Sequence, residues 1–207
     1  MDNFSIFFHL SGDGPFFEKS FTKINNIISE NNLKKNIIYC YNGSIEKYSD
    51  IKKKLKNDDV IFLQNHCNYF ECPTLNFLLN ECKNYQNNKK ILYIHTKGAY
   101  NYKSPVYDDW IDVMSYFTIK KFENCLYLLD TYAAVGVDFT NDPWPHFSGN
   151  FWWANSSHIK QLKALKTLNR YDCEKWICSL KNNYYNLFSS QINVLNNKGC
   201  DKKLYYV

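Results

Sequence analysis

The sequence of 207 residues contains no apolar run that approaches the ~18 to 20 residues of a membrane-spanning helix. Its beginning also lacks the basic segment followed by an apolar stretch that is typical of an export signal. Neither internal repeats nor low-complexity linkers interrupt it. These absences lead us to expect one soluble, cytoplasmic domain over residues 1–207, because a chain of this length can bury one sizeable core.

Basic charge is not concentrated anywhere in the sequence, although the formal net charge is +5. The lysines are scattered, whereas a nucleic-acid-binding protein usually gathers them into a patch or stripe. We therefore expect no nucleic-acid partner, and the excess positive charge mildly favours an anionic ligand. Aromatic residues make up 18% of the chain, which is high, so many rings must line surfaces or clefts as well as the core.

The eight cysteines include no Cys-x-x-Cys pair, and several of them, such as Cys40 and Cys82, fall within apolar strand or helix patterns. Buried free thiols in a reducing compartment explain this pattern. His66, Cys67 and Cys72 lie close enough in sequence to suggest zinc, but no second pair of ligands follows at the spacing of a zinc finger. The sequence therefore favours free thiols over a zinc site.

Short apolar runs rich in β-branched and aromatic residues alternate with longer helical patterns. This alternation predicts an α/β fold in which helices flank a mostly parallel sheet, an α/β/α sandwich. The expected strands are 4–10, 36–41, 59–63, 90–95, 133–139 and 147–154, and the clearest helices are 73–85 and 106–129, the latter broken near Lys120. In open sheets of this kind ligands bind beyond the carboxyl ends of the strands.

The first candidate site follows the expected strand 90–95, where apolar residues give way to His95, Thr96, Lys97 and Gly98. Such a turn can present backbone N–H groups, the Thr96 hydroxyl and the Lys97 ammonium to an oxyanion. A Walker phosphate loop is excluded, because no glycine-rich segment leads into the turn. The alternative is an ordinary strand end with a lysine in solvent.

The second candidate site is the segment 146–155. If residues 147–154 form one strand, alternation places Ser148, Asn150 and Trp152 on one face and Trp153 on the other. Sugars are bound by such combinations, in which an aromatic ring meets the sugar face and polar side chains meet its hydroxyls. We therefore expect Trp152 in a sugar pocket and Trp153 in the core, while packing of both rings is the alternative.

The third candidate site is the start of an apparent helix near residues 170–177, which carries Asp172 and Glu174. Carboxylates in a first helical turn complement the helix dipole, which is one explanation. The other is catalytic, because a carboxylate within hydrogen-bond reach of an acceptor hydroxyl can remove its proton. We expect Glu174 to fill that role, with Asp172 second.

Segments 71–75, 92–98, 109–110, 135–137 and 146–154, among them the strings HTKG and HFSGNFWWA, together resemble a family of GT-A-type glycosyltransferases. Its members occur in large DNA viruses, where one glycosylates the capsid of a chlorella virus, and in bacterial surface-polysaccharide clusters. The resemblance covers about residues 4–180. It implies a GT-A fold, a nucleotide-diphosphate sugar donor, with a UDP-sugar expected, and transfer to a hydroxyl of a glycan or glycoprotein. For a viral member the compartment is the host cytoplasm.

The resemblance and the strand order together suggest roles for individual residues. The donor diphosphate is expected at His95, Thr96, Lys97 and Gly98, and topology alone places the nucleotide near His9, Leu10, Tyr41 and Gly43. The sugar and the acceptor are expected at His146, Ser148, Gly149, Asn150, Trp152, Asn155 and Asp109. The alternative to an enzyme is a carbohydrate-binding domain that kept the cleft and lost the chemistry.

The sequence departs from the wider GT-A pattern in one respect, because it contains no Asp-x-Asp motif. In GT-A enzymes that motif commonly holds a divalent metal on the donor diphosphate. Here the corresponding strand end carries His95, Thr96 and Lys97. We expect Lys97 to supply part of the missing charge, since a lysine approaches phosphate oxygens as a compact point charge. Whether Mn²⁺ or Mg²⁺ is also required stays open at this point.

Overall fold

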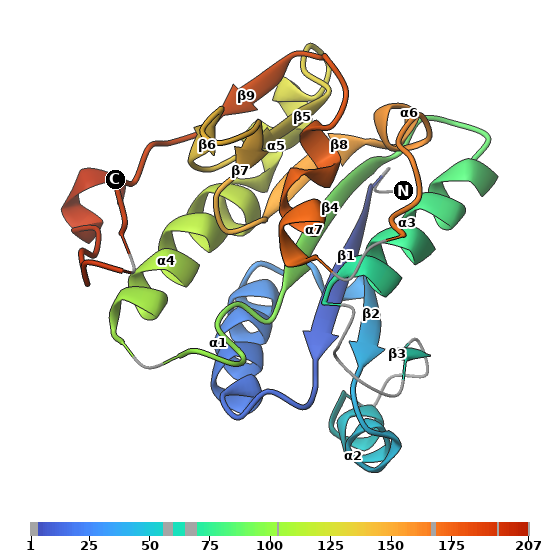
Figure 1. Cartoon of the computed structure of the whole chain (residues 1–207), viewed down its shortest axis with the longest axis vertical. Coiled ribbons are helices and arrows are strands. Elements are labelled where there is room, and N and C mark those ends of the chain that lie inside the picture. The colour runs from blue at the N-terminus through green and yellow to red at the C-terminus, as the bar shows by residue number, and fades with distance from the viewer. Residues whose placement is uncertain are drawn as a thin grey trace.

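A seven-stranded sheet in the order β3-β2-β1-β4-β8-β5-β9 forms the centre of the protein (Figure 1). The computed structural model describes residues 4–55, 60–64, 70–102, 104–166, 169–193 and 195–206. The strands of the sheet are β1 (Phe4–Ser11), β2 (Ile37–Asn42), β3 (Val60–Gln64), β4 (Lys90–His95), β5 (Ala134–Gly136), β8 (Trp152–Asn155) and β9 (Tyr184–Asn186). A separate two-stranded ribbon consists of β6 (Phe139–Thr140) and β7 (His146–Phe147).

The first four strands are parallel to one another, with β1 between β2 and β4 and with β3 outside β2. β8 runs antiparallel to both β4 and β5, and β9 runs parallel to β5, so the sheet is mostly parallel. The first four expected strands are confirmed to within one or two residues, although Asp59 lies outside the described residues. Because β1, β2 and β4 end at one edge of the sheet, the polar residues that follow them meet there.

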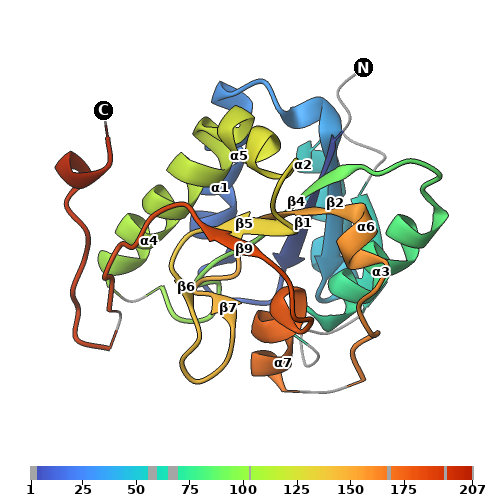
Figure 2. The ribbon, with the colours of Figure 1, turned by 90° about the horizontal axis from the view of Figure 1, so that it is seen from above.

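Helices cover both faces of the sheet, which confirms the predicted α/β sandwich (Figure 2). The helices are α1 (Phe17–Glu30), α2 (Ile45–Leu55), α3 (Cys72–Asn84), α4 (Val106–Ser115), α5 (Phe122–Leu128), α6 (Ser156–Ile159) and α7 (Arg170–Lys175), with shorter helical turns at Lys34–Asn36, Tyr116–Lys120, Trp176–Cys178 and Lys202–Leu204. α1, α4 and α5 pack on one face, and α3, α6 and α7 pack on the other.

The apolar periodicity of the sequence located the main helices correctly. α3 buries Leu75, Leu78, Leu79 and Cys82, and Pro73 lies in its first turn, where a missing N–H removes no helical hydrogen bond. The expected break near Lys120 is confirmed, since a single π-helical turn at Tyr116–Lys120 separates α4 from α5. π-helical turns are a recognised cause of such breaks.

The expected strand 147–154 is wrong, because two residues with left-handed backbone conformations interrupt it. Gly149 has a φ of 90° and Asn150 a φ of 57°, so the chain turns between β7 and β8. Because of this turn, side chains do not alternate between the two faces continuously from β7 to β8. Phe147 and Trp152 therefore pack in the same apolar cluster. The expected strand 133–139 is likewise shorter, because Asp138 has a φ of 54° and the chain leaves the sheet after β5.

The described cysteines match the expectation of buried free thiols: Cys40, Cys72, Cys82, Cys125, Cys173, Cys178 and Cys200 are all buried and none is in a disulfide. His66 and Cys67 lie outside the described residues. Within the described part of the chain, the structure contains no helix whose length and apolarity would allow it to span a bilayer.

Candidate functional site

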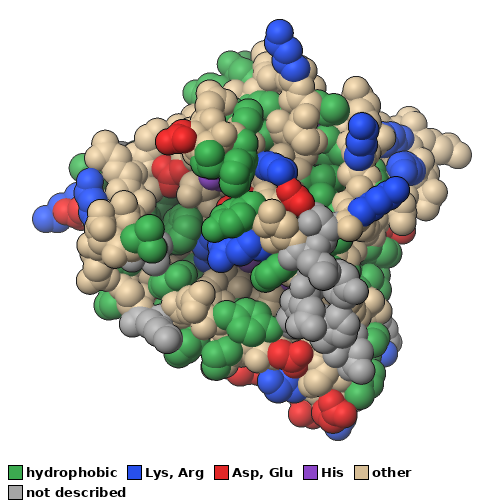
Figure 3. Space-filling view, in the orientation of Figure 1, with side chains coloured by type: hydrophobic (Ala, Val, Ile, Leu, Met, Phe, Trp, Pro, Cys, Tyr) green, Lys and Arg blue, Asp and Glu red, His purple; other side chains and the backbone are tan. Residues whose placement is uncertain are grey.

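A cavity of about 210 Å³ lies at the carboxyl ends of β1 and β4. It is lined by Ser11, Phe70, Glu71, His95, Thr96, Lys97, Ala99, Tyr100, Asn101, Asn150, Arg170 and Glu174. These residues come from the ends of β1 and β4, the residues that lead into α3, the turn before β8, and α7. In Figure 3 the centre of the face is hollowed, and basic side chains are visible at the bottom of the hollow.

Lys97 is the buried cation of this cavity. Its side chain is 7% exposed, and its Nζ lies 3.8 Å from the centre of the Trp110 ring. None of the described carboxylates forms an ion pair with it. Burial lowers the pKa of Lys97 to about 8, although the charges of Glu174 and Glu71 act in the opposite direction. A buried ammonium without an ion-pair partner is costly, so it favours an anionic ligand.

Glu71 lies on the cavity wall, and one oxygen of its carboxylate accepts two hydrogen bonds. Its Oε2 accepts hydrogen bonds from the Tyr93 hydroxyl at 2.7 Å and the Asn150 amide at 2.6 Å. The side-chain amide oxygen of Asn150 in turn accepts a hydrogen bond from the Trp152 indole N–H at 2.8 Å. Burial, followed by the charge of Glu71, raises the pKa of Tyr93 well above its usual value. This network holds Glu71 in one orientation.

His95 faces the remaining oxygen of Glu71. Its Nε2 lies 2.9 Å from the carbonyl oxygen of Gly149, which can only accept, so Nε2 carries the proton. Burial, followed by the charge of Lys97, lowers the pKa of His95 to about 3, so the ring is neutral near pH 7. Its Nδ1 therefore offers a lone pair, 3.8 Å from Glu71 Oε1. Two acceptors that face each other at this distance suit a ligand hydroxyl that donates to one of them.

Arg170 and Glu174 lie one turn apart on α7 and both line the cavity. The Arg170 Nη2 is 3.0 Å from Glu174 Oε1. Burial disfavours the charge of Arg170, but the hydrogen bond and charge of Glu174 outweigh it and raise the pKa of the guanidinium. The cavity thus contains two cations, Lys97 and Arg170, and two carboxylates, Glu71 and Glu174.

Comparison with known proteins identifies a family. Residues 14–195 match the model of a domain of unknown function, DUF8361. The chain belongs to this family. Every residue that lines the cavity, except Ser11, lies within the matched range.

Among solved structures, the chain is similar to a candidate nucleotide-diphospho-sugar transferase from Desulfovibrio desulfuricans G20, with 9% identity and a TM-score of 0.43. The similarity covers 91% of this chain and 81% of the other. A comparison with curated proteins gave no match.

The DUF8361 domain brings together only part of the residues that the sequence suggested. His95, Thr96 and Lys97 line the cavity, as do Asn150 and Glu174. Gly98 supports them indirectly, since its φ of 76° turns the chain beside His95. A Cβ at Gly98 would lie 2.9 Å from the Tyr107 ring.

The predicted nucleotide residues lie at the same edge of the sheet but do not line the cavity. Leu10 and Tyr41 are fully buried in the core, and His9 is 1% exposed. His9 is hydrogen-bonded through Nδ1 to Thr74 and through Nε2 to Ser11, and burial lowers its pKa to about 4. Gly43 donates its N–H to the carbonyl of Gln64. Packing therefore buries the side chains of His9, Leu10 and Tyr41, and a nucleotide at these residues stays a prediction.

Several predicted sugar and acceptor residues also have other roles. Trp152 is fully buried and stacks on Tyr93 with ring centres 5.0 Å apart, so its side chain cannot form a pocket wall. Trp153 is equally buried, as predicted. Asn155 lies at the opposite end of β8, beside Lys90, where its amide binds the carbonyl of Leu129. Antiparallel pairing carries the end of β8 away from the carboxyl edge of β4.

The remaining predicted residues do not line the cavity. His146 binds the carbonyl of Trp144, the half-buried Ser148 donates its N–H to the carbonyl of Asp138, and Gly149 contributes the carbonyl that holds His95. Asp109 lies against Gly199 of the C-terminal segment, since a Cβ there would lie 2.1 Å from its carboxylate. Asp172 lines a separate pocket and pairs with Lys175 at 2.6 Å, so its place as second catalytic candidate is not supported by position.

The sequence assigned no role to several cavity residues, namely Phe70, Ala99, Tyr100, Asn101 and Arg170. Arg170 belongs to the third candidate segment, and its spacing of four from Glu174 is a signal for an ion pair on a helix. Phe70 and Tyr100 carry no such signal. An aromatic residue in a loop can be buried or exposed, and only the fold decides between them.

The described side chains offer few groupings that could ligate a metal ion. Within the described ranges, no three His, Cys, Asp or Glu side chains converge in a way that would hold a metal ion. Asp108, which lies near the β4 end in sequence, is bonded to Lys19 and Lys23 and accepts a bond from Tyr102. The described residues alone therefore do not form a metal site.

Proposed function

We propose that this protein is a glycosyltransferase that moves a sugar from a nucleotide-diphosphate donor, with a UDP-sugar expected, to a hydroxyl of a glycan or glycoprotein. The observation that carries the proposal is Lys97, a nearly buried ammonium that faces a cavity and has no carboxylate partner among the described residues. Arg170 is the second cation of that cavity. The position of the cavity, beyond the ends of parallel strands, is where open α/β sheets bind their ligands.

The cations suit the leaving group of the reaction. As the bond between the anomeric carbon and the diphosphate breaks, negative charge builds on the phosphate oxygens. Lys97 and Arg170 then stabilise the transition state more than the ground state, because the charge they neutralise is larger in the transition state. Binding of the diphosphate also supplies the anionic partner that Lys97 lacks, which offsets the cost of burying its charge.

The carboxylates suit the other half of the reaction. The acceptor hydroxyl oxygen forms the new bond to the anomeric carbon, and its proton passes to a carboxylate. We assign this role to Glu174, which lines the cavity on a helix start and is oriented by Arg170. Glu71 is held by Tyr93 and Asn150, so it is suited to bind a sugar hydroxyl through Oε1, with His95 Nδ1 opposite.

A thermal-shift panel tests the proposal, with UDP-, GDP-, CMP- and dTDP-sugars, each in Mn²⁺ and in EDTA. A ligand present at 100 times its Kd stabilises the native state by about 2.7 kcal/mol, which raises the apparent Tm by several degrees. Product analysis then measures donor hydrolysis and sugar transfer. Failure of every nucleotide sugar to bind would contradict the proposal. Binding without turnover would indicate the alternative, a sugar-binding domain that has lost the chemistry.

A further inference from the structure

Two exposed aromatic side chains line the cavity in addition to its charged groups. Phe70 is 41% exposed and Tyr100 is 47% exposed. Phe70 precedes α3 and Tyr100 lies in the connection between β4 and α4, so they come from different elements. In the view of Figure 1 the start of α3 and the β4–α4 connection lie on opposite sides of β1. The two residues that line the cavity therefore belong to separate connections of the fold.

The backbone at both rings is anchored. The carbonyl of Phe70 accepts a hydrogen bond of 3.2 Å from the Asn42 amide at the end of β2. Tyr100 lies in a turn closed by the bond from the Asn101 N–H to the Gly98 carbonyl, and the preceding Ala99 carbonyl accepts from the Phe16 N–H at 2.8 Å. The exposure of the rings is thus a property of fixed backbone positions, in which apolar ring surface stays in contact with water.

We propose that Phe70 and Tyr100 form the nucleobase subsite of the donor, which they bind by stacking. This inference rests on the proposed function, and it replaces the nucleotide position that topology suggested at His9 and Tyr41. The diphosphate requires the cations Lys97 and Arg170, and the sugar and acceptor require the hydrogen-bonding groups near Glu71 and Glu174. The base is the flat, weakly polar part of the donor, and it matches the two rings.

Stacking on aromatic side chains contributes about 1 to 3 kcal/mol per base by alanine substitution, which corresponds to a factor of about 5 to 150 in Kd. It tolerates any base, because every base presents a π face. The two rings therefore supply affinity, and the choice among bases falls to polar groups on the same wall, of which Asn101 is one.

Calorimetric or fluorescence titration of UDP and of uridine tests the subsite with Phe70→Ala and Tyr100→Ala. We expect each variant to weaken both ligands by about 5- to 150-fold. Phe70→Tyr and Tyr100→Phe should bind both ligands nearly as tightly as the wild type, because each variant keeps an aromatic ring. Lys97→Met should weaken UDP and leave uridine nearly unchanged, which separates the base from the phosphates.

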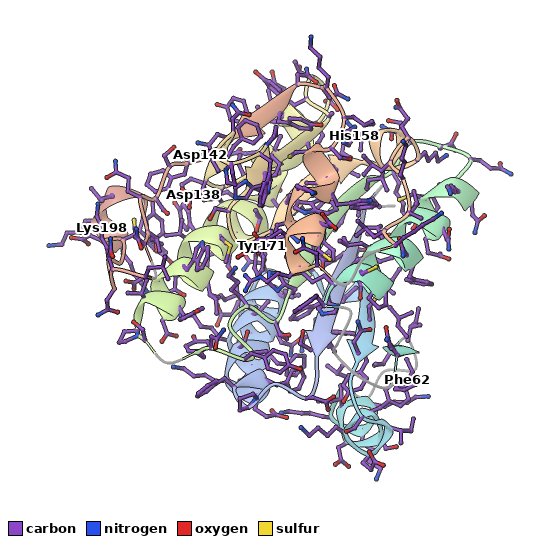
Figure 4. The ribbon with its side chains drawn as sticks, in the orientation of Figure 1. Phe62, Asp138, Asp142, His158, Tyr171 and Lys198 are labelled. Atoms are coloured by element: carbon purple, nitrogen blue, oxygen red, sulfur yellow. The ribbon has the colours of Figure 1, made fainter. Side chains whose placement is uncertain are left out.

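Tyr171→Ala is the matched control. Tyr171 is 48% exposed and lies at the start of α7 near the middle of the face (Figure 4), but it does not line the cavity. Its removal should change the Kd of UDP by less than about twofold, as expected for a surface substitution. Unchanged UDP affinity in both alanine variants would overturn the subsite while leaving the proposed function intact. Failure of the wild-type protein to bind any nucleotide would overturn the proposed function as well.

Discussion

The carboxyl ends of β2 and β4 lie at the same edge of the sheet, yet they differ in what their polar groups do. At the end of β2, the Tyr41 hydroxyl donates a hydrogen bond to the Ser44 carbonyl, and the Gly43 N–H donates one to the Gln64 carbonyl. After β4, the Lys97 ammonium lies over the Trp110 ring, forms no ion pair with a carboxylate among the described residues, and faces a cavity. The fold thus leaves a charged group facing a cavity at the end of β4, whereas the Tyr41 hydroxyl and the Gly43 N–H at the end of β2 have partners within the protein.

The surroundings of the two strand ends explain this difference. Tyr41 packs into an aromatic cluster with Tyr48 and Phe62, and Figure 4 places Phe62 near α2, away from α7. The end of β4 instead meets α7 and the turn at Gly149, which bring further charged and polar groups. The first arrangement places the Tyr41 ring in the core, and the second places charged and polar groups around a cavity.

The largest effect that this comparison predicts is on catalysis. Glu174→Gln should lower sugar transfer by about 10² to 10⁴-fold while donor binding persists, because the side chain keeps its shape and loses its basicity. Asp172→Asn is the matched control on the same helix, since Asp172 lines a different pocket. Steady-state transfer rates and UDP titration measure the two effects. Full activity of Glu174→Gln would show that Glu174 does not accept the proton of the acceptor hydroxyl, and Glu71 would be the next carboxylate to examine.

The next effect concerns the two tryptophans of β8. Both are fully buried, Trp152 on the face covered by α3 and Trp153 on the face covered by α4 and α5. Trp152→Ala and Trp153→Ala should each lower the free energy of unfolding by about 3 to 5 kcal/mol. Urea denaturation measures this change. If Trp152→Ala keeps wild-type stability but loses sugar binding, its original assignment to the pocket is correct.

Lys97→Met tests the comparison directly at the β4 end. Loss of hydrogen bonds to a charged group should weaken UDP by about 1.5 to 3 kcal/mol, roughly 10- to 150-fold. The same variant should be more stable than the wild type without ligand, because it removes a buried, unpaired charge. Lys47→Met is the control beside β2, where the lysine is exposed and lies 3.9 Å from Asp13. Equal UDP affinity for Lys97→Met and wild type would show that Lys97 does not contribute to UDP binding.

The pH dependence of binding gives a smaller effect. The pKa of Lys97 in the free protein is about 8, so UDP affinity should be constant below that pH and fall by up to about tenfold per unit above it. Arg170 stays charged and His95 stays neutral across this range.

The pH dependence of folding stability has the opposite sign to that of UDP affinity. The unfolded lysine has a pKa of ~10.4, so the unfolded state binds more protons from about pH 8 upward, and the contribution of Lys97 to stability rises with pH across this window.

Titrations of UDP at pH 7, 8 and 9 measure this dependence, and Lys97→Met should abolish it. A decline of affinity that persists in Lys97→Met would assign the titration to another group.

The smallest effect is expected at the β2 end. Tyr41→Phe removes the 3.2 Å bond to the Ser44 carbonyl and should lower the free energy of unfolding by about 0.5 to 1.5 kcal/mol. Its UDP affinity should equal that of the wild type, because Tyr41 is fully buried. A loss of UDP affinity without a loss of stability would restore the nucleotide position predicted from topology.

Local patterns in the sequence were sufficient for the first four strands, for the clearest helices and for the HTKG strand end. Apolar runs located β1, β2, β3 and β4, and the spacing of three and four located α3. These signals are reliable because they depend on which residues a strand or helix must bury. The turn at Gly149 and Asn150 was missed, because alternation of side chains predicts one strand wherever no proline intervenes.

By itself the sequence determined the four parallel strands β1 to β4, their helical cover and the candidate anion site at Lys97, since each depends on residues close together in the chain. Tertiary structure decided which polar groups remain available to a ligand. It buried His9 and Tyr41, turned Trp152 into the core, and joined Glu71 with Glu174 across about 100 positions of sequence. The physical reason is that exposure and partnership belong to contacts between distant segments, and no local pattern of residues encodes them.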